Sequence, residues 1–253
     1  MNVVLITQNE PFFLAKNIQY LINNFPEHSK VVSCVVSDVS PFGKKESFLK
    51  KALKTYKIFG IRFFLYYSFK FIHGFFNPGN NVFNILKNNN IDSIVLSKSI
   101  NNEESLEIIR SYNPDLLVSI LGNQIFKSKL INLAPNGCLN LHTALLPKYR
   151  GLMPTFWVLK NREKFTGVSV FFVDEKIDNG PIIVQKKIKI TTNKQAELIR
   201  LTKKLGMDSI IEAINKIKNN DYKLIENDEK LSSYYTFPKK EDVRIFIKYN
   251  TFF

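Results

Sequence analysis

Short apolar runs that alternate with helical patterns constrain the fold of this chain most. Residues 12–24 carry apolar side chains at helical spacing, and residues 102–110 begin with acidic and end with basic side chains, as a helix dipole favours. The intervening runs are typical of buried strands in a parallel sheet. The first four predicted strands are 3–7, 31–36, 93–96 and 116–120.

Later runs continue the alternation. We expect strands at 138–141, 168–173 and 182–190, followed by an amphipathic helix at 196–218. The pattern predicts an α/β fold with a doubly wound, Rossmann-like, mostly parallel sheet. In such sheets ligands bind beyond the carboxyl ends of the strands.

Chain length bounds the domain organisation. The 253 residues, 45% of them hydrophobic, suit one large domain. We expect a main domain at 1–218, interrupted by a helical insertion at 44–76, and a C-terminal appendix at 219–253. The appendix is too short for a core of its own, so it should pack on the main domain.

The charge of the chain favours anionic partners. Its formal net charge is +14 and its pI is near 9.6, which suits nucleotides, phosphorylated sugars, RNA or an acidic membrane surface. The alternative is that a Lys- and Asn-rich composition spreads lysines over a solvated surface, because charge describes association and not fold.

Cysteine use and the first residues indicate a cytoplasmic protein. Cys34 and Cys138 lie in apolar stretches without any CxxC spacing, so we expect two buried thiols and no metal site of that type. Residues 1–7 lack the basic start and the cleavage site of a signal peptide. No run reaches the roughly 18 uncharged apolar residues that a transmembrane helix needs.

The segment 44–76 interrupts the alternation of strands and helices. Basic and aromatic anchors are typical of a helix that lies in a membrane interface. Packing of the aromatics on the domain, or on a second subunit of a homodimer, is favoured because aromatic stripes are usually core. Base stacking on nucleic acid is a weaker alternative. The basic and aromatic residues are Lys44, Lys45, Lys50, Lys51, Lys54, Lys57, Phe63, Phe64, Tyr66, Tyr67, Phe69, Phe71, Phe75 and Phe76.

The tripeptide Asn140-Leu141-His142 carries the first candidate chemistry. Strand side chains alternate in direction, so Asn140 and His142 should lie on one face at the end of a strand. An amide and an imidazole placed together can polarise a carbonyl and handle a proton. Asp178, in an Asp-Asn-Gly-Pro turn, is a carboxylate that could fix the charge state of the imidazole. Each feature alone is also compatible with a satisfied polar group in a turn.

A longer ordered pattern surrounds these residues. Its members are Gly137, Asn140, His142, Leu145, Leu146, Pro147, Tyr149, Arg150, Gly151, Thr166, Gly167, Val168, Ser169, Asp178, Gly180, Pro181, Ile182 and Gln185. The pattern resembles the 10-formyltetrahydrofolate-dependent formyltransferase family, and so many matches in order are more specific than one short motif. Thr143 and Ala144 depart from the usual residues after the histidine, outside the three candidate catalytic positions.

The resemblance implies formyl transfer to an amine by a catalytic domain at 1–218, with 10-formyltetrahydrofolate as the co-substrate and without a metal. Asn140 and His142 would stabilise the oxyanion, and Asp178 would hold the charge of His142 and relay a proton. By the same resemblance the folate pocket would be lined by Asn123, Gln124, Ile125, Phe126, Val173 and Asp174. Of these, Ile125 and Phe126 are equally compatible with ordinary core residues.

The acceptor is expected to be a small amine, in the first place an amino sugar linked to a nucleotide. Phe171 stands where glycinamide ribonucleotide transformylases carry a histidine, and the loop 7–12 has no glycine-rich phosphate cradle. The appendix is shorter than the C-terminal domain of methionyl-tRNA formyltransferases, although the charge favours that alternative. A folate- or RNA-binding relic is the non-enzyme alternative. Lys148 and Arg150 could bind an acceptor phosphate, and bracing of a loop is favoured for Arg150.

Overall fold

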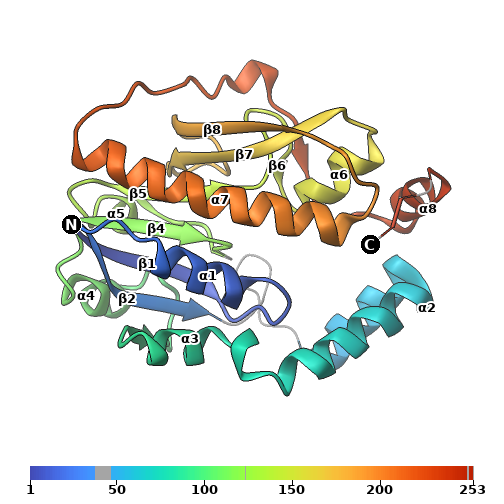
Figure 1. Ribbon diagram of the computed structural model, residues 1–253, viewed down its shortest axis with the longest axis horizontal. Helices are drawn as coiled ribbons and strands as arrows, with labels where there is room; N and C mark the ends of the chain where they lie inside the picture. Colours follow the sequence, from blue (N-terminus) through green and yellow to red (C-terminus); the bar gives the residue numbers. More distant parts are fainter. Residues whose placement is uncertain (38–46, 123, 250, 253) are drawn as a thin grey trace.

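A computed structural model describes residues 1–37, 47–122, 124–249 and 251–252. Within these residues a seven-stranded sheet has the order β3-β2-β1-β4-β5-β7-β8, and the first five strands in this order are parallel (Figure 1). The strands are β1 (Asn2–Gln8), β2 (Lys30–Ser37), β3 (Asp92–Ile94), β4 (Leu116–Ile120), β5 (Cys138–His142), β7 (Phe165–Phe172) and β8 (Ile182–Lys189). The α/β fold with a mostly parallel, doubly wound sheet is therefore confirmed.

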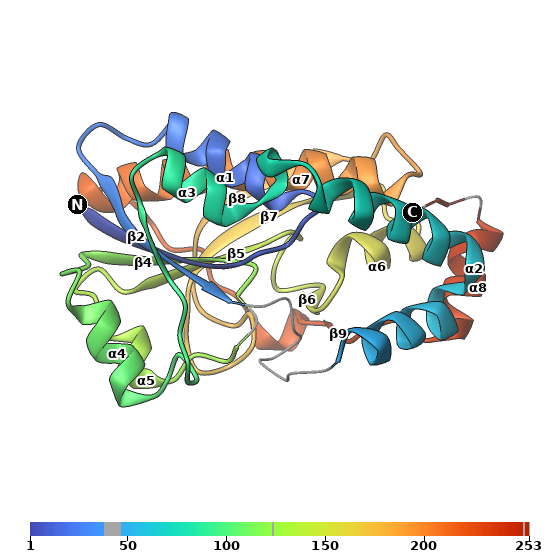
Figure 2. The ribbon, with the colours of Figure 1, turned by 90° about the horizontal axis from the view of Figure 1, so that it is seen from below.

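Helices cover both faces of this sheet. Figure 2 shows α1 (Leu14–Asn23), α3 (Val82–Asn88) and α7 (Gln195–Lys218) on one side, and α4 (Glu103–Arg110) and α5 (Ser128–Ile131) on the other. Successive residues of β1 enter opposite cores, because strand side chains alternate. The two cysteines also lie in opposite cores, both free and buried as expected, and burial raises the pKa of each thiol.

Element boundaries follow the sequence where the apolar pattern is strong. The strand at 116–120 is predicted to the residue, and the helices at 102–110 and 196–218 differ by one residue at their starts. The short helices α3, α6 (Pro154–Lys160) and α8 (Lys240–Lys248) were not expected. All three have nine residues or fewer, so periodicity alone gives them little signal.

The C-terminal segment runs back over the main body of the molecule. Strand β9 (Tyr234–Tyr235) pairs with β6 (Arg150–Gly151), which lies just beyond the catalytic candidate His142. Two short 3-10 turns, η2 (Pro78–Asn80) and η3 (Glu229–Leu231), complete the described elements. In α8, the ring of Phe246 stacks on Phe156 of α6 with centroids 4.7 Å apart, and both side chains are fully buried.

The inserted segment forms α2 (Phe48–Phe75), a helix that is interrupted at Gly60. Gly60 has φ 81° and ψ 176°, so the helical path breaks there. Residues 44–46 of the predicted insertion lie outside the described part of the chain. Among the described residues, no helix has the length and apolar character needed to span a bilayer.

The buried ring of Phe246 in α8 allows a test of how much the C-terminal segment contributes to the free energy of unfolding. We expect Phe246→Ala to lower the free energy of unfolding by about 3–5 kcal/mol, because it removes a fully buried aromatic ring. Ile247, the next residue, is 53% exposed, and Ile247→Ala should change stability by less than about 0.5 kcal/mol. Urea unfolding followed by circular dichroism measures both. Equal, small effects would show that the segment does not belong to the cooperative fold.

Candidate active site

A pocket of about 250 Å³ opens at the carboxyl edge of the parallel strands. Its walls include Gln8 at the end of β1, residues 119–122 at the end of β4 and residues 140–143 at the end of β5. Strand β1 lies between β2 and β4, so the strand order reverses at this point. A doubly wound sheet leaves its natural ligand crevice at such a reversal.

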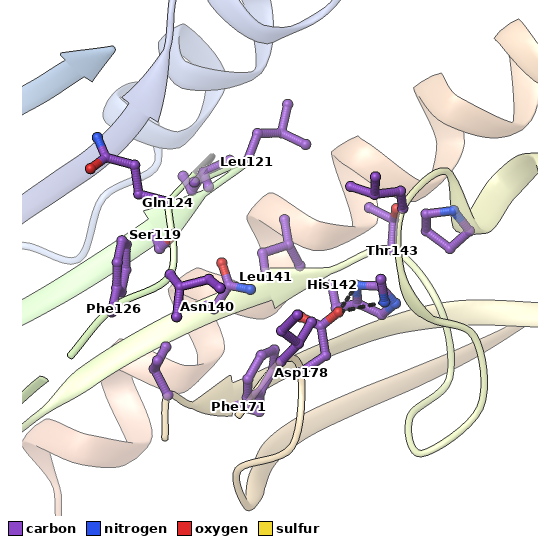
Figure 3. Close-up of a pocket in the computed structure, with 18 of the residues that line it drawn as sticks. Ser119, Leu121, Gln124, Phe126, Asn140, Leu141, His142, Thr143, Phe171 and Asp178 are labelled. Atoms are coloured by element: carbon purple, nitrogen blue, oxygen red, sulfur yellow. Dashed lines mark hydrogen bonds and ion pairs between the residues drawn. The ribbon is translucent and has the colours of Figure 1, made fainter. Parts of the chain in front are cut away.

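Asn140 and His142 project into this pocket from alternate positions of β5. Figure 3 shows their side chains on the same side of the strand, with Asp178 beside the imidazole. The ring of His142 is buried, with 6% of the residue exposed. Among the described residues, no side chain or backbone group hydrogen-bonds to the Asn140 carboxamide. Its NH2 group is therefore available to a ligand oxygen in the pocket.

The contacts of His142 indicate which tautomer of the ring is present. Nε2 lies 2.7 Å from the carbonyl oxygen of Tyr149, and because a carbonyl only accepts, Nε2 carries a proton. Nδ1 faces Oδ2 of Asp178 at 3.5 Å. A proton gained by the ring is therefore gained at Nδ1, between the imidazole and a carboxylate. The same oxygen of Asp178 accepts a hydrogen bond from the Gly151 amide at 2.8 Å.

A buried arginine braces the turn that carries Asp178. One terminal nitrogen of Arg150 donates to Oδ1 of Asn179 at 2.7 Å, and the other donates to the carbonyl and side-chain oxygens of Asn227 at 3.1 and 2.8 Å. The Asn227 amide donates in turn to the carbonyls of Asp178 and Gly180, both at 3.0 Å. Arg150 therefore has the bracing role that its sequence position favours, although its partners are amide and carbonyl oxygens rather than a carboxylate.

Three residues that line the pocket have a left-handed backbone conformation. Leu121, Met153 and Asp178 line it with φ values of 59°, 54° and 50°, a region that costs L-residues energy and is frequent at functional sites. Gly151 has φ 93°, and a Cβ there would lie 2.2 Å from the Tyr235 carbonyl oxygen. Position 151 must therefore be glycine if its amide is to donate to the Asp178 carboxylate in this conformation.

Two polar side chains hold the loop that follows His142. The Ser169 hydroxyl donates to the Ala144 carbonyl at 2.8 Å and accepts from the Leu146 amide at 3.1 Å. The Gln185 amide donates to the Leu146 carbonyl at 2.9 Å. These contacts give a structural reason for the serine and the glutamine of the sequence pattern, for which the sequence alone suggested no role.

The residues predicted to contact folate gather at one end of the pocket. Gln124, Ile125, Phe126, Val173 and Asp174 all line it, and Asn123 lies outside the described residues. Phe126 is also core, with 6% exposed, whereas Ile125 is 50% exposed. The Asp174 carboxylate accepts from the Asn179 amide at 2.8 Å. The structure thus brings these loops to the same cavity as Asn140, His142 and Asp178.

The opposite end of the pocket contains residues that the sequence did not single out. Leu14 of α1 and Lys203 and Met207 of α7 line it. The Lys203 ammonium lies 3.7 Å from a carboxylate oxygen of Glu10, and burial lowers the pKa of Lys203 while Glu10 opposes that shift. Lysine in an amphipathic helix is ordinary, so only the packing of α7 on the sheet reveals this position.

Glu10 lies in the turn that precedes α1. Its carboxylate accepts from the amides of Phe12 at 2.7 Å and Phe13 at 3.2 Å, just before the first helical residue, Leu14. Phe171, 2% exposed, forms a further apolar wall of the pocket beside the catalytic candidates. Lys148 is exposed and is not among the lining residues.

Comparison with known proteins was made against family models and curated sequences. A model described as formyl transferase matches residues 76–214. The methionyl-tRNA formyltransferases of Kosmotoga olearia and Thermotoga neapolitana are 36% identical over 146 residues and 38% identical over 151 residues. The aligned parts cover 57% and 58% of this chain and 47% of each relative. The chain therefore spans about half the length of these curated relatives.

Solved structures share the fold. Glycinamide ribonucleotide transformylase 1 from Symbiobacterium toebii has a TM-score of 0.60 and 16% identity, covering 87% of this chain and 88% of that one. A sugar N-formyltransferase from a Shewanella species has a TM-score of 0.59 and 18% identity, covering 98% and 86%. An N-formyltransferase from Helicobacter canadensis has a TM-score of 0.57 and 18% identity, covering 92% and 70%.

The family match includes β4, β5, the loop after it, β7 and most of α7, which supply most of the residues that line the pocket. It extends over more than half of the chain and agrees with the resemblance in the sequence pattern. This chain belongs to the formyl transferase family.

Proposed function

We propose that this protein transfers a formyl group from 10-formyltetrahydrofolate to a primary amine. The observation that carries the proposal is the convergence of an unpaired carboxamide, an imidazole and a carboxylate in one pocket, from Asn140, His142 and Asp178. These groups match what acyl transfer needs: a hydrogen-bond donor for a developing oxyanion and a group that handles a proton. Formyl transfer by these groups requires no metal ion.

The reaction forms one carbon–nitrogen bond and breaks another. The acceptor amine attacks the formyl carbon, and the tetrahedral oxyanion receives a hydrogen bond from the Asn140 NH2 group. Collapse breaks the bond to N10 of the folate, which gains a proton as the amine loses one, so no net proton is released. His142 can take up a proton at Nδ1, where the Asp178 carboxylate faces it at 3.5 Å. One preorganised oxyanion donor is typically worth about 3 kcal/mol.

The two ends of the pocket suggest how the substrates are arranged. The pteridine of the co-substrate would lie between residues 124–126 and residues 173–174, where exposed backbone and apolar walls suit a flat heterocycle. The amine acceptor would then enter from the end formed by α1 and α7. In this proposed arrangement the formyl group would lie over Asn140 and His142, between the two substrates.

We infer that the acceptor is an amino sugar linked to a nucleotide. The Glu10 carboxylate binds the Phe12 and Phe13 amides of the turn before α1, so these two amides are not available to an acceptor phosphate. The Lys203 ammonium has one ion-pair partner at 3.7 Å and further donor capacity for hydroxyl or phosphate oxygens. The Helicobacter canadensis N-formyltransferase, whose fold is similar, was crystallised with folinic acid and dTDP-3-aminofucose, which supports this acceptor class.

Methionyl-tRNA is the second candidate acceptor. The curated relatives with this activity are 36% and 38% identical to the chain, and its net charge of +14 suits RNA. The aligned region covers 57–58% of the chain and includes the catalytic pattern, which the members of the family share. Identity in this region therefore supports the chemistry more strongly than it supports a particular acceptor.

An acceptor panel tests the proposal directly. Purified protein is incubated with 10-formyltetrahydrofolate and either nucleotide-linked amino sugars, glycinamide ribonucleotide or charged initiator tRNA, and tetrahydrofolate release is followed. We expect turnover with a subset of the amino-sugar nucleotides. Activity on tRNA alone would reassign the acceptor and leave the chemistry intact. Absence of turnover with every amine would contradict the proposed function.

Replacement of the buried histidine tests the mechanism. We expect His142→Gln to reduce kcat by about 10²–10⁴-fold, because it removes the group that gains a proton opposite Asp178. Binding of folinic acid, measured by calorimetry, should persist because the pteridine end of the pocket is unchanged. His28 is an exposed histidine that bonds Ser29 and Asn215, so His28→Gln is the matched control and should retain full activity. Equal rates for both variants would remove His142 from the mechanism.

Replacement of Lys203 tests the orientation of the substrates. We expect Lys203→Met to raise KM for the acceptor about tenfold or more, since a charged hydrogen bond contributes roughly 1.5–3 kcal/mol. Folinic acid affinity should stay unchanged, because Lys203 lies at the other end of the pocket. Lys204→Met, at the next and solvent-exposed position of α7, is the control. A change in folate affinity without a change in acceptor KM would reverse the assignment of the two ends.

A further inference from the structure

The outer face of α2 presents a row of exposed apolar side chains. After the break at Gly60 they recur at spacings of three or four residues, as one stripe along a helix. The helix extends from one end of the molecule and contacts α8 (Figures 1 and 2). The stripe consists of Ile61 (52% exposed), Leu65 (60%), Phe69 (70%), Ile72 (57%) and Phe76 (77%).

The opposite side of α2 faces the body of the protein. Phe59, Phe63 and Tyr67 stack in sequence with ring centroids 4.4 and 4.3 Å apart, and Tyr67 meets Phe12 edge-on at 5.4 Å. Burial raises the pKa of Tyr67 to about 12. Leu65 is two positions beyond Phe63 and so lies about 200° around the helix from it. The expectation that the aromatics pack on the domain thus describes one side of α2, and the other side faces solvent.

Basic residues lie on both sides of the break at Gly60, with Arg62 next to the stripe and Lys50, Lys54 and Lys57 before the break. The helix from Phe48 to Phe75 carries Lys50, Lys51, Lys54, Lys57, Arg62 and Lys70, and its sequence contains no aspartate or glutamate. Of these, Lys50, Lys54, Lys57 and Arg62 are exposed. Large exposed apolar side chains together with exposed cations are typical of helices that lie in the interface of an anionic bilayer.

We propose that α2 docks this protein on an anionic lipid surface. Ile61, Leu65 and Ile72 of the stripe would lie in the interface, and the basic side chains would lie against the headgroups. Charge decides between a membrane and a second copy of the chain. Two copies that met through this face would juxtapose two sets of cations, since α2 has no acidic partner to offer. Anionic lipid supplies both the missing negative charge and the apolar phase. The proposal does not depend on the identity of the acceptor.

Vesicle flotation with the full chain tests this proposal. We expect the protein to float with vesicles of phosphatidylcholine and phosphatidylglycerol at low salt. It should remain at the bottom of the gradient with phosphatidylcholine alone, and added salt should release it because the attraction is screened. Protein that stays at the bottom with anionic vesicles at low salt would overturn the proposal.

Matched variants assign the effect to α2. The triple variant Ile61→Ser/Leu65→Ser/Ile72→Ser should lower the floating fraction at least about tenfold, because binding scales with buried apolar area. Val95 and Leu231 are 69% and 63% exposed away from α2, so Val95→Ser/Leu231→Ser is the control and should float like the unaltered chain. Equal losses in both variants would contradict a role for α2, and circular dichroism verifies that each variant is folded.

A charge variant and a mass measurement complete the test. Lys50→Gln/Lys57→Gln/Arg62→Gln should bind anionic vesicles more weakly and with a smaller salt dependence. Sedimentation velocity without lipid should give a monomer for the unaltered chain. A dimer that the triple serine variant abolishes would assign the stripe to a second copy of the chain and overturn the lipid proposal.

Discussion

The carboxylate of Asp178 is the contact around which the candidate site is assembled. It accepts the Gly151 amide and faces Nδ1 of His142, so one side chain joins the loop after β5, the turn before β8 and the end of the catalytic strand. Arg150 and Asn227 keep that turn in place. Because Asn227 belongs to the C-terminal segment, residues that look like an appendix in the sequence support the chemistry of the pocket.

In the proposed arrangement the two ends of the pocket have different tasks. Asn140, His142, Gly122 and residues 124–126 and 173–174 form one end and include the residues that the family pattern describes. Side chains from α1 and α7 form the other end, where Lys203 lies beside Glu10, whose carboxylate binds amides of the turn before α1. A site built in this way can keep its chemistry while helix residues change the acceptor, which is why fold and family alone leave the acceptor open.

The composition of the inserted helix α2 did not reveal which of its sides is buried. Lysines and aromatics in 44–76 are compatible with a membrane helix, a packed insertion or a nucleic-acid surface, and the sequence favours packing because aromatic stripes are usually core. In the structure, Phe63 and Tyr67 turn toward the body while Leu65 and Ile72 face solvent. The sheet was easier to predict, because its central strands β1 and β4 are nearly continuous apolar runs whose burial on both faces leaves a clear local pattern.

The amino-acid sequence by itself determined the strand–helix alternation, the shared face of Asn140 and His142, and the family to which the chain belongs. These depend on periodicity and on ordered local patterns. Only the tertiary structure decided that Tyr149 sets the tautomer of His142, that Lys203 lines the pocket and that one side of α2 is exposed. The positions of Lys203 and α2 depend on contacts between segments far apart in the chain. The Tyr149 contact depends on the path of the loop after β5, for which the local sequence carries no signal.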